Sequence, residues 1–177
     1  MNFRYNSDCI GIIGASQQGK TFLAKQIISN IDKNKVYVIE NAFNFSGNRI
    51  NVPKPYSPKN LDEAIRKFRK LYDKLFVIDD VDNYVPYQSK EFTALAIDGR
   101  HQNLGLIYIS HRVKGIDKRV LFNTDYLFLS YGVVREDLDY INSVYDIDYG
   151  KYNSITKNSY VFYLIDFVNH SDGLVRL

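Results

Sequence analysis

The residues with the clearest chemical meaning run from Gly14 to Thr21 and read GASQQGKT. They fit the phosphate-binding pattern G-x-x-x-x-G-K-[ST], in which glycines let successive backbone N–H groups turn inward around phosphate oxygens. The lysine of this pattern reaches the terminal phosphates of a nucleotide, and the hydroxyl of its last residue binds Mg²⁺. We therefore expect Lys20 and Thr21 to take these roles. The expected nucleotide contacts are Gly14, Ala15, Ser16, Gln17, Gln18, Gly19, Lys20, Thr21 and Phe22.

The residues on either side of this loop support the same interpretation. The apolar run Cys9–Ile13 predicts a buried strand, and the apolar periodicity from Lys20 to Ile31 predicts a helix. A helix N-terminus would add its unpaired N–H groups and its dipole to the phosphate site. The alternative is a glycine turn that only joins strand to helix, and it does not account for the Lys-Thr pair. The sequence therefore predicts a nucleotide-binding site.

Two acidic residues follow another apolar run, in the sequence Leu75-Phe-Val-Ile-Asp79-Asp80. Ligands of open α/β sheets bind at the carboxyl ends of the strands, so both carboxylates are expected beside the phosphate loop. Asp79 can hold Mg²⁺ opposite Thr21, and Asp80 can polarise a water for attack on the terminal phosphate. A water-activating acid is typical of enzymes that hydrolyse nucleotides repeatedly. The alternative for Asp80 is that it caps the following turn.

Further candidates flank the apolar run Leu106–Ser110. Ser110 or His111 would face the terminal phosphate if this strand lies between the phosphate-loop strand and the acidic strand, and the sequence does not decide between them. An arginine from a neighbouring subunit can stabilise charge on the transferring phosphoryl group. Arg100 is the first candidate for that role and Arg112 is the second. The alternative for each arginine is a surface ion pair.

The elements that must position these residues alternate along the chain. Apolar runs separated by amphipathic helical stretches are typical of an α/β fold with a mainly parallel sheet and helices on both faces. The predicted strands are Cys9–Ile13, Val36–Glu40, Leu75–Asp79, Leu106–Ser110, Tyr126–Tyr131 and Tyr160–Phe167, the last paired with a short run at Gly173–Leu177. The predicted helices cover Lys20–Ile31, Leu61–Tyr72 with Asn60 as its cap, Ser89–Gln102, and Arg135–Val144 with Val134 on its buried side.

Length and composition limit the class of protein. A chain of 177 residues with 45% hydrophobic and 24% charged residues fits one globular domain over residues 1–177. A net charge of +3 is too small to indicate a nucleic-acid partner by itself. The single Cys9 excludes an internal disulfide and fits a reducing compartment. No apolar run reaches membrane-spanning length and the N-terminus is polar, so we expect an intracellular protein without a membrane span.

The order of these motifs resembles that of the HerA/FtsK superfamily of P-loop ATPases. Between about Asp8 and Tyr131, the residues that carry the resemblance are Gly14–Thr21, Val77–Asp80, Gly99–Asn103, Leu106–His111 and Asn123–Leu129. Within the superfamily, the chain most resembles the small genome-packaging ATPases of double-stranded DNA viruses, including archaeal viruses with internal membranes. The resemblance implies a RecA-like P-loop NTPase fold whose sensor strand lies between the two Walker strands.

The resemblance also implies a function. It implies Mg²⁺-dependent ATP hydrolysis between the subunits of a homo-oligomeric ring, a pentamer or hexamer, in the host cytoplasm and associated with the virion during assembly. The implied partners are double-stranded DNA, bound without base reading, and a capsid or portal-type protein. Candidate DNA-gripping segments are Asn41–Lys59 and Tyr84–Lys90, because both offer Lys and Tyr. The superfamily usually has Gln at the sensor position, where this chain has Ser110 or His111.

The sequence leaves three other functions as alternatives. A related ATPase for filamentous virion assembly or DNA transfer would share these motifs, although such proteins often carry a membrane segment. A small P-loop kinase would need an arginine-rich lid and no water-activating acid, so Asp79–Asp80 disfavours it. A nucleotide-binding switch or scaffold would bind ATP and show no turnover.

Overall fold

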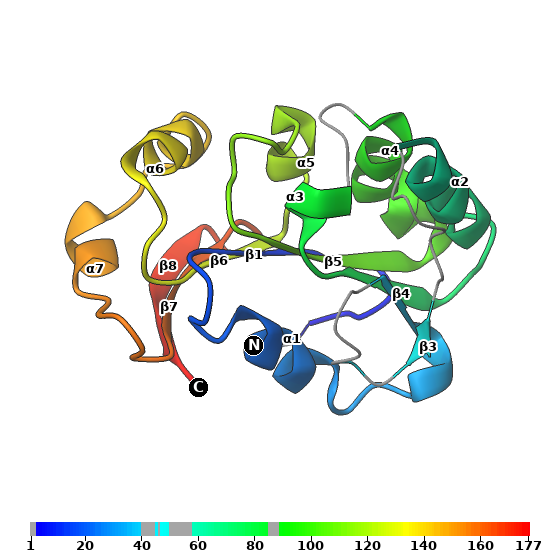
Figure 1. The fold of residues 1–177 in the computed structure, drawn as a ribbon, viewed down its shortest axis with the longest axis horizontal. Coiled ribbons are helices and arrows are strands. Elements are labelled where there is room, and N and C mark those ends of the chain that lie inside the picture. Colours follow the sequence, from blue (N-terminus) through cyan, green and yellow to red (C-terminus); the bar gives the residue numbers. More distant parts are fainter. Residues whose placement is uncertain (1–2, 40–44, 46, 50–57, 85–88) are drawn as a thin grey trace.

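The computed structural model describes residues 3–39, 45, 47–49, 58–84 and 89–177. These residues form an eight-stranded sheet in the order β3-β2-β4-β5-β1-β6-β7-β8 (Figure 1). All pairs from β3 to β6 in this order are parallel, whereas β7 is antiparallel to both β6 and β8. The mainly parallel sheet predicted from the sequence is confirmed.

The strands follow the predicted apolar runs, with small differences at their ends. They are β1 (Cys9–Ile13), β2 (Val36–Ile39), β3 (Asn48–Arg49), β4 (Lys74–Ile78), β5 (Leu104–Ser110), β6 (Tyr126–Leu129), β7 (Val161–Asp166) and β8 (Ser171–Arg176). The predicted edge pairing is confirmed, because β7 and β8 form an antiparallel hairpin. Asp79 lies just past the carboxyl end of β4 and not within the strand.

The helices are shorter than predicted, and several are additional. They are α1 (Lys20–Ile28), α2 (Pro58–Phe68), α3 (Val81–Tyr84), α4 (Lys90–Asp98), α5 (Lys118–Phe122), α6 (Arg135–Asn142) and α7 (Tyr149–Asn153), with 3₁₀ turns η1 (Lys33–Lys35) and η2 (Gly99–Gln102). The prediction of Asn60 as a cap was wrong, because α2 already begins at Pro58. Proline suits a first helical position, where no intrahelical N–H bond is needed. None of the described helices is long and apolar enough to cross a bilayer.

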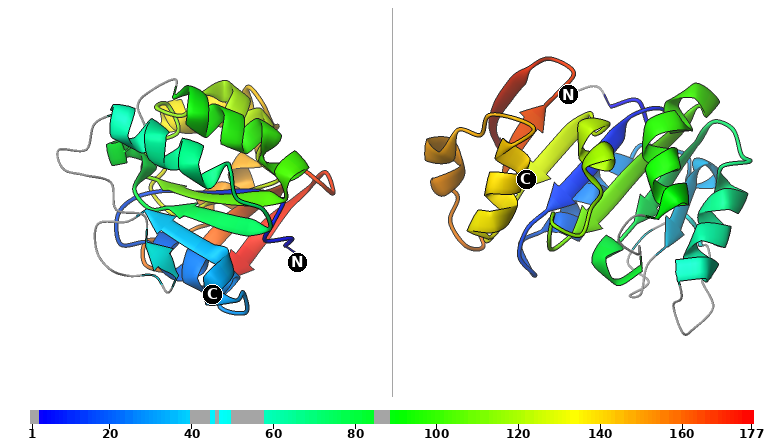
Figure 2. Two further views of the ribbon diagram at one scale, coloured as in Figure 1. Left: turned by 90° about the vertical axis from the view of Figure 1, so that its right-hand side faces the viewer. Right: turned by 90° about the horizontal axis from the view of Figure 1, so that it is seen from above.

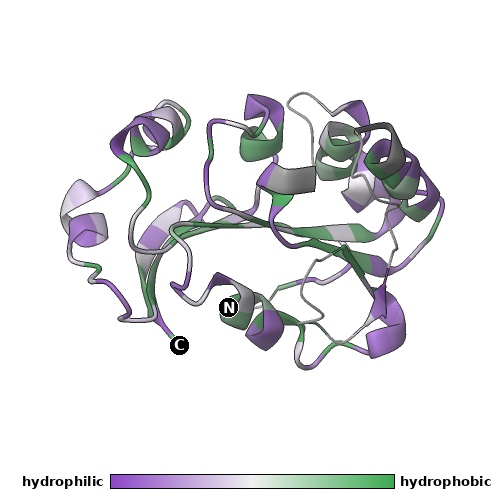
Figure 3. Cartoon of the chain, in the orientation of Figure 1, coloured by the Kyte–Doolittle hydropathy of each residue, from purple (hydrophilic) through white to green (hydrophobic). Residues whose placement is uncertain are grey.

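Helices cover both faces of the sheet (Figures 1 and 2). On one face, Leu23 and Ile28 of α1 share an apolar cluster with Ile12 of β1. On the other face, residues of α2, α4, α5 and α6 share a second cluster with Ile13, the next residue of the same strand. Successive residues of a strand point to opposite faces, so β1 contributes to both clusters. Figure 3 shows the sheet as mostly hydrophobic and much of the outer helical surface as hydrophilic.

The strand order decides where the candidate residues meet. β5 lies between β1 and β4, as the resemblance implied for the sensor strand. Ile13 pairs with Ser110, and Ile78 pairs with Tyr108, so the three parallel strands end close to one another. The carboxyl ends of these strands therefore bring together the phosphate loop, the acidic pair after β4 and the polar end of β5.

Candidate nucleotide-binding site

The phosphate loop joins β1 to α1, and its two glycines adopt backbone angles that favour glycine. Gly14 has a φ of 151° and Gly19 a φ of 83°. A Cβ atom on Gly14 would lie 1.8 Å from Ser130 Oγ, and one on Gly19 would lie 2.7 Å from Cδ1 of Tyr160. Both positions therefore require glycine for its conformation and for its lack of a side chain.

Lys20 is buried, and its ammonium lies within the loop. Nζ donates to the carbonyl oxygens of Gly14 at 2.9 Å and Ala15 at 2.8 Å, and it lies 3.1 Å from Nδ1 of His111. Burial lowers the pKa of Lys20, while the nearby carboxylates, Asp80 foremost, favour its charged form. Hydrogen bonds to an anionic phosphate are stronger than those to neutral carbonyls, so this ammonium is well placed to bind one.

Thr21 and Asp79 place two oxygen atoms together at the start of α1 and the end of β4. Thr21 Oγ1 donates to Asp79 Oδ2 at 3.2 Å, and Asp79 is buried. Such oxygens are the donors that Mg²⁺ prefers, and nucleotide-bound Mg²⁺ takes only one or two carboxylates besides phosphates and waters. Among the described residues, no group of three or more His, Cys, Asp or Glu side chains could hold a metal. The pair fits a magnesium ion that binds with a nucleotide.

Asp80 and His111 face each other across the ends of β4 and β5. Asp80 Oδ1 lies 3.2 Å from His111 Nε2, and both side chains are partly exposed. Lys20 can only donate, so His111 Nδ1 is assigned as an acceptor and the ring proton as carried by Nε2, toward Asp80. Lys20, His111 and Asp80 thus form one hydrogen-bonded chain. Asp80 has a φ of 57°, which Asp and Asn tolerate better than most residues.

Ser110 has a different environment from His111. It is fully buried, and its Oγ donates to Asp82 Oδ1 at 2.6 Å. The backbone N–H of His111 donates to the other oxygen of Asp82, also at 2.6 Å. Asp82 therefore holds the end of β5 and fixes the direction of His111. In the sequence, the only signal of this role is the position of Asp82 two residues after Asp80.

The two candidate arginines lie at opposite ends of β5, and both have acidic partners. Arg100 lies in η2 at the amino end, where NH2 is 3.4 Å from the carbonyl oxygen of Asn123 and 3.7 Å from Asp125 Oδ1. Arg112 lies beyond the carboxyl end, and its Nε donates to the buried Asp137 at 2.7 Å. The seven residues of β5 span about 20 Å, so Arg100 lies far from the phosphate loop of its own chain.

The remaining loop residues divide by where their side chains lie. Ser16 and Gln17 are exposed, and Phe22 is half exposed at the first turn of α1. Gln18 is buried, and its amide makes two hydrogen bonds with Asn158, accepting from the backbone N–H at 2.9 Å and donating to Oδ1 at 3.2 Å. The side chain of Gln18 therefore holds the segment before β7, and its backbone alone is available to a phosphate.

The predicted DNA-gripping segments lie partly outside the described residues. Of Asn41–Lys59, residues 41–44, 46 and 50–57 lie outside them, and of Tyr84–Lys90, residues 85–88 do. The described parts include β3, Pro58 and Lys59 at the start of α2, and Ser89. Ser89 caps α4 by accepting a hydrogen bond from the N–H of Phe92.

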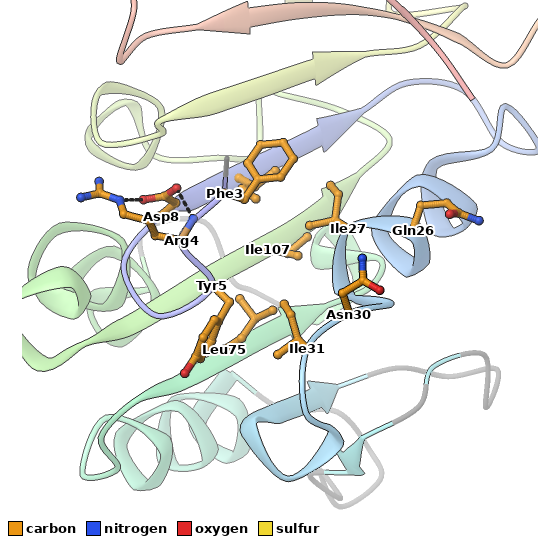
Figure 4. A pocket seen from close by; sticks show the side chains of 11 residues that line it. Phe3, Arg4, Tyr5, Asp8, Gln26, Ile27, Asn30, Ile31, Leu75 and Ile107 are labelled. Carbon is orange, nitrogen blue, oxygen red and sulfur yellow. Dashed lines mark hydrogen bonds and ion pairs between the residues drawn. The ribbon is translucent and has the colours of Figure 1, made fainter. Parts of the chain in front are cut away.

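A separate cavity of about 520 Å³ lies near the other end of α1 (Figure 4). Its apolar lining includes Ile27 and Ile31 of α1 with Ile107 of β5, and its polar rim includes the paired side chains of Arg4 and Asp8. Its lining contains none of the phosphate-loop residues and neither Asp80 nor His111. This cavity is distinct from the candidate nucleotide site.

Known structures share this arrangement of strands, although no protein-family model and no curated protein sequence matches the chain. The genome packaging NTPase B204 from Sulfolobus turreted icosahedral virus 2, in complex with AMPPCP, superposes with a TM-score of 0.80 at 15% identity, over 97% of this chain and 98% of that one. The chain has the RecA-like P-loop NTPase fold. The similarity implied by the motif order is thereby confirmed at the level of the fold.

Two bacterial proteins share the P-loop NTPase fold with this chain. The N-terminal domain of zonular occludens toxin from Neisseria meningitidis superposes with a TM-score of 0.63 at 11% identity, over 97% of this chain and 94% of that one. EccC from Thermomonospora curvata, represented by its ATPases 2 and 3, has a TM-score of 0.69 at 12% identity, over 96% of this chain and 36% of that one. One fold therefore occurs in proteins with different named roles.

Proposed function

We propose that this chain is a single-domain, Mg²⁺-dependent P-loop ATPase over residues 1–177 that drives double-stranded DNA into a viral capsid. The observation that carries the proposal is the hydrogen-bonded chain of Lys20, His111 and Asp80 beside the Thr21–Asp79 pair. The similarity in fold to a genome packaging NTPase supports the choice of DNA packaging over other uses of ATP.

Each side chain has a distinct task in the proposed reaction. Lys20 binds the terminal phosphates, while the backbone N–H groups of the phosphate loop hold their oxygens. Thr21 and Asp79 would hold Mg²⁺, which would supply positive charge to the phosphates. Asp80 accepts the proton of the attacking water. His111 orients the Asp80 carboxylate through Nε2–H and links it to the ammonium that contacts phosphate.

We place this reaction between the subunits of a homo-oligomeric ring in the host cytoplasm. Arg100 lies at the amino ends of the strands, whereas the phosphate loop lies at their carboxyl ends. A role of Arg100 in catalysis therefore requires a neighbouring subunit. DNA would be held by its phosphate backbone, without reading of base sequence. A capsid or portal-type protein would receive the DNA. The number of subunits, five or six, follows the resemblance alone.

Steady-state ATP hydrolysis tests the catalytic part of this proposal. We expect hydrolysis by the wild type and near-complete loss in Lys20→Ala and Asp80→Asn, because the first removes the phosphate ligand and the second removes the base. Asn tolerates the φ of Asp80, so Asp80→Asn should unfold at the wild-type temperature. Lys33→Ala, at an exposed position in η1, is the matched control and should keep full activity. Undiminished turnover in Asp80→Asn would overturn its assignment as the base.

The DNA part needs a separate measurement. We expect double-stranded DNA fragments of unrelated sequence to raise the turnover rate equally, because contacts to the phosphate backbone carry no sequence information. Binding should weaken steeply as salt rises, since counterion release drives it. If the chain hydrolyses ATP but binds no DNA at low salt, the assignment as an ATPase stands and the packaging role is rejected.

A further inference from the structure

Tyr160 combines three unusual features beside the phosphate loop. Its φ is 52°, its side chain is 50% exposed, and its ring lies against Gly19, where an added Cβ would come within 2.7 Å of Cδ1. A bulky residue rarely adopts such a positive φ, because its Cβ then approaches the following carbonyl oxygen. Backbone strain of this kind persists where surrounding contacts impose it, and it is concentrated at ligand sites.

Contacts on both sides hold Tyr160 in this place. Two residues earlier, Asn158 is bound by the amide of Gln18 from within the phosphate loop. The carbonyl oxygen of Tyr160 accepts a hydrogen bond from the N–H of Leu177 at 3.1 Å. The next residue, Val161, begins β7 and pairs with Arg176 of β8. The segment is thus fixed to the loop at one end and to the hairpin at the other, while half of the aromatic surface stays uncovered.

The position of Tyr160 relative to the catalytic groups suggests what covers that surface. Asp80 and His111 lie on the β4 and β5 side of β1, whereas β7 and β8 lie on its other side (Figure 1). A nucleotide whose terminal phosphate meets Lys20 and His111 has its base at the opposite end of the phosphate chain. The ring of Tyr160 lies against Gly19, and β7 lies on the side of β1 away from β5, so a base that extends away from β5 would meet this ring.

We infer that Tyr160 is the platform on which the base of the bound nucleotide stacks, an inference that rests on the proposed nucleotide-binding function. Stacking on an aromatic ring favours every nucleobase, because each has a π-face. The platform would therefore increase affinity for nucleoside triphosphates over inorganic triphosphate without selecting one base. The Gln18–Asn158 bonds would act as a positioning contact that keeps the platform beside the phosphates.

A single fluorescent reporter tests this inference directly. The chain contains no Trp, so Tyr160→Trp introduces one indole at the proposed platform. ATP with Mg²⁺ should change its fluorescence, whereas tripolyphosphate with Mg²⁺ should not, since it has no base to stack. Phe122→Trp is the matched control, at an aromatic position of α5 that is 63% exposed, and neither ligand should change its signal. An unchanged Tyr160→Trp signal with saturating ATP would overturn the inference.

Binding constants separate this inference from the proposed function. Tyr160→Ala should weaken ATP binding by on the order of tenfold and leave tripolyphosphate binding unchanged. Tyr160→Phe keeps the ring and should bind both ligands like the wild type. An equal loss for both ligands, or no loss for ATP, would overturn the platform and leave the nucleotide site intact. Failure of the wild type to bind either ligand would instead overturn the proposed function.

Discussion

At the scale of the residue, His111 connects the group that would bind phosphate with the group that would activate water. Its ring lies 3.1 Å from Lys20 Nζ on one side and 3.2 Å from Asp80 Oδ1 on the other. We expect His111→Ala to lower the kcat for ATP at least about tenfold, because the Asp80 carboxylate loses the donor that orients it. ATP affinity should change little, since Lys20 is retained. Steady-state kinetics and direct ATP binding measure the two effects separately.

His111→Gln provides the control for this prediction. A glutamine amide can accept from an ammonium and donate to a carboxylate, so this variant should keep more activity than His111→Ala. If the two variants lose the same activity, the hydrogen bonds of the His111 ring do not account for its contribution to catalysis. If neither loses activity, the proposed role of His111 is wrong.

Sequence alone could predict the phosphate loop and the Asp79–Asp80 pair, because their spacing is local and each follows a buried strand. It could not choose between Ser110 and His111, since adjacent residues point in different directions and only the packed sheet shows which one is buried. The Gln18–Asn158 contact was beyond prediction, because it joins residues 140 positions apart with no shared local pattern.

At the scale of the element, a buried carboxylate attaches α6 to the segment after β5. Asp137 Oδ2 accepts from Arg112 Nε and from the N–H of Val113, and its Oδ1 accepts from the N–H of Lys114. We expect Asp137→Ala to lower the free energy of unfolding by about 2–4 kcal/mol, because these donors lose their partner. Urea denaturation measures the change.

A control for Asp137 exists on the same helix. Asp139 is 55% exposed and pairs with Arg135 one turn away, at 3.0 Å. Exposed pairs of this kind contribute little, so Asp139→Ala should cost less than about 1 kcal/mol. Equal losses for the two substitutions would contradict the structural role given to Asp137.

The ionised carboxylate of Asp73 makes the stability of the fold depend on pH. Hydrogen bonds from Lys35, Tyr5 and Asn6 hold the pKa of Asp73 at about 2, below its usual 3.8. A carboxyl group whose pKa is lowered by folding stabilises the fold fully above its unfolded pKa and loses that effect as pH falls. The stability difference between wild type and Asp73→Asn should therefore be constant near neutral pH and shrink from pH 3.8 toward about 2.

Thermal unfolding across this pH range measures the Asp73 contribution. Asn suits the positive φ of 54° at this position, so the substitution tests the charge and not the backbone. A difference that stays the same from neutral pH down to about pH 2 would show that the carboxylate bonds do not stabilise the fold.

The strands could be predicted closely because buried apolar runs bounded by polar residues mark them. The short helices could not: α5 and α7 have five residues each, too few for an apolar stripe to repeat. The sequence also placed two residues wrongly at the ends of helices, because the apolar pattern does not mark where a helix begins or ends. Val134 precedes the first turn of α6 and is 37% exposed, and Tyr72 lies past the end of α2 and is 67% exposed.

At the scale of the whole molecule, the distance between Arg100 and the phosphate loop leads to a prediction about assembly. We expect Arg100→Ala and Lys20→Ala to be nearly inactive alone and to recover part of the activity when mixed. In a mixed ring, an intact arginine from one variant would face an intact phosphate loop from the other. ATP turnover at a series of mixing ratios, with molecular mass from light scattering, measures this. Absence of recovery in rings shown to be mixed would remove the role of Arg100 in trans.

The central position of β1 has a consequence for how the chain becomes folded. This strand is made well before its partners, since Cys9 pairs with Leu106 and Ile10 with Tyr126. Pairing between such distant segments is slow, and unpaired apolar strands are prone to aggregate meanwhile. The phosphate loop can therefore take its final shape only after β5 and β6 have been made. A nucleotide that binds the finished loop would then favour the folded product by mass action.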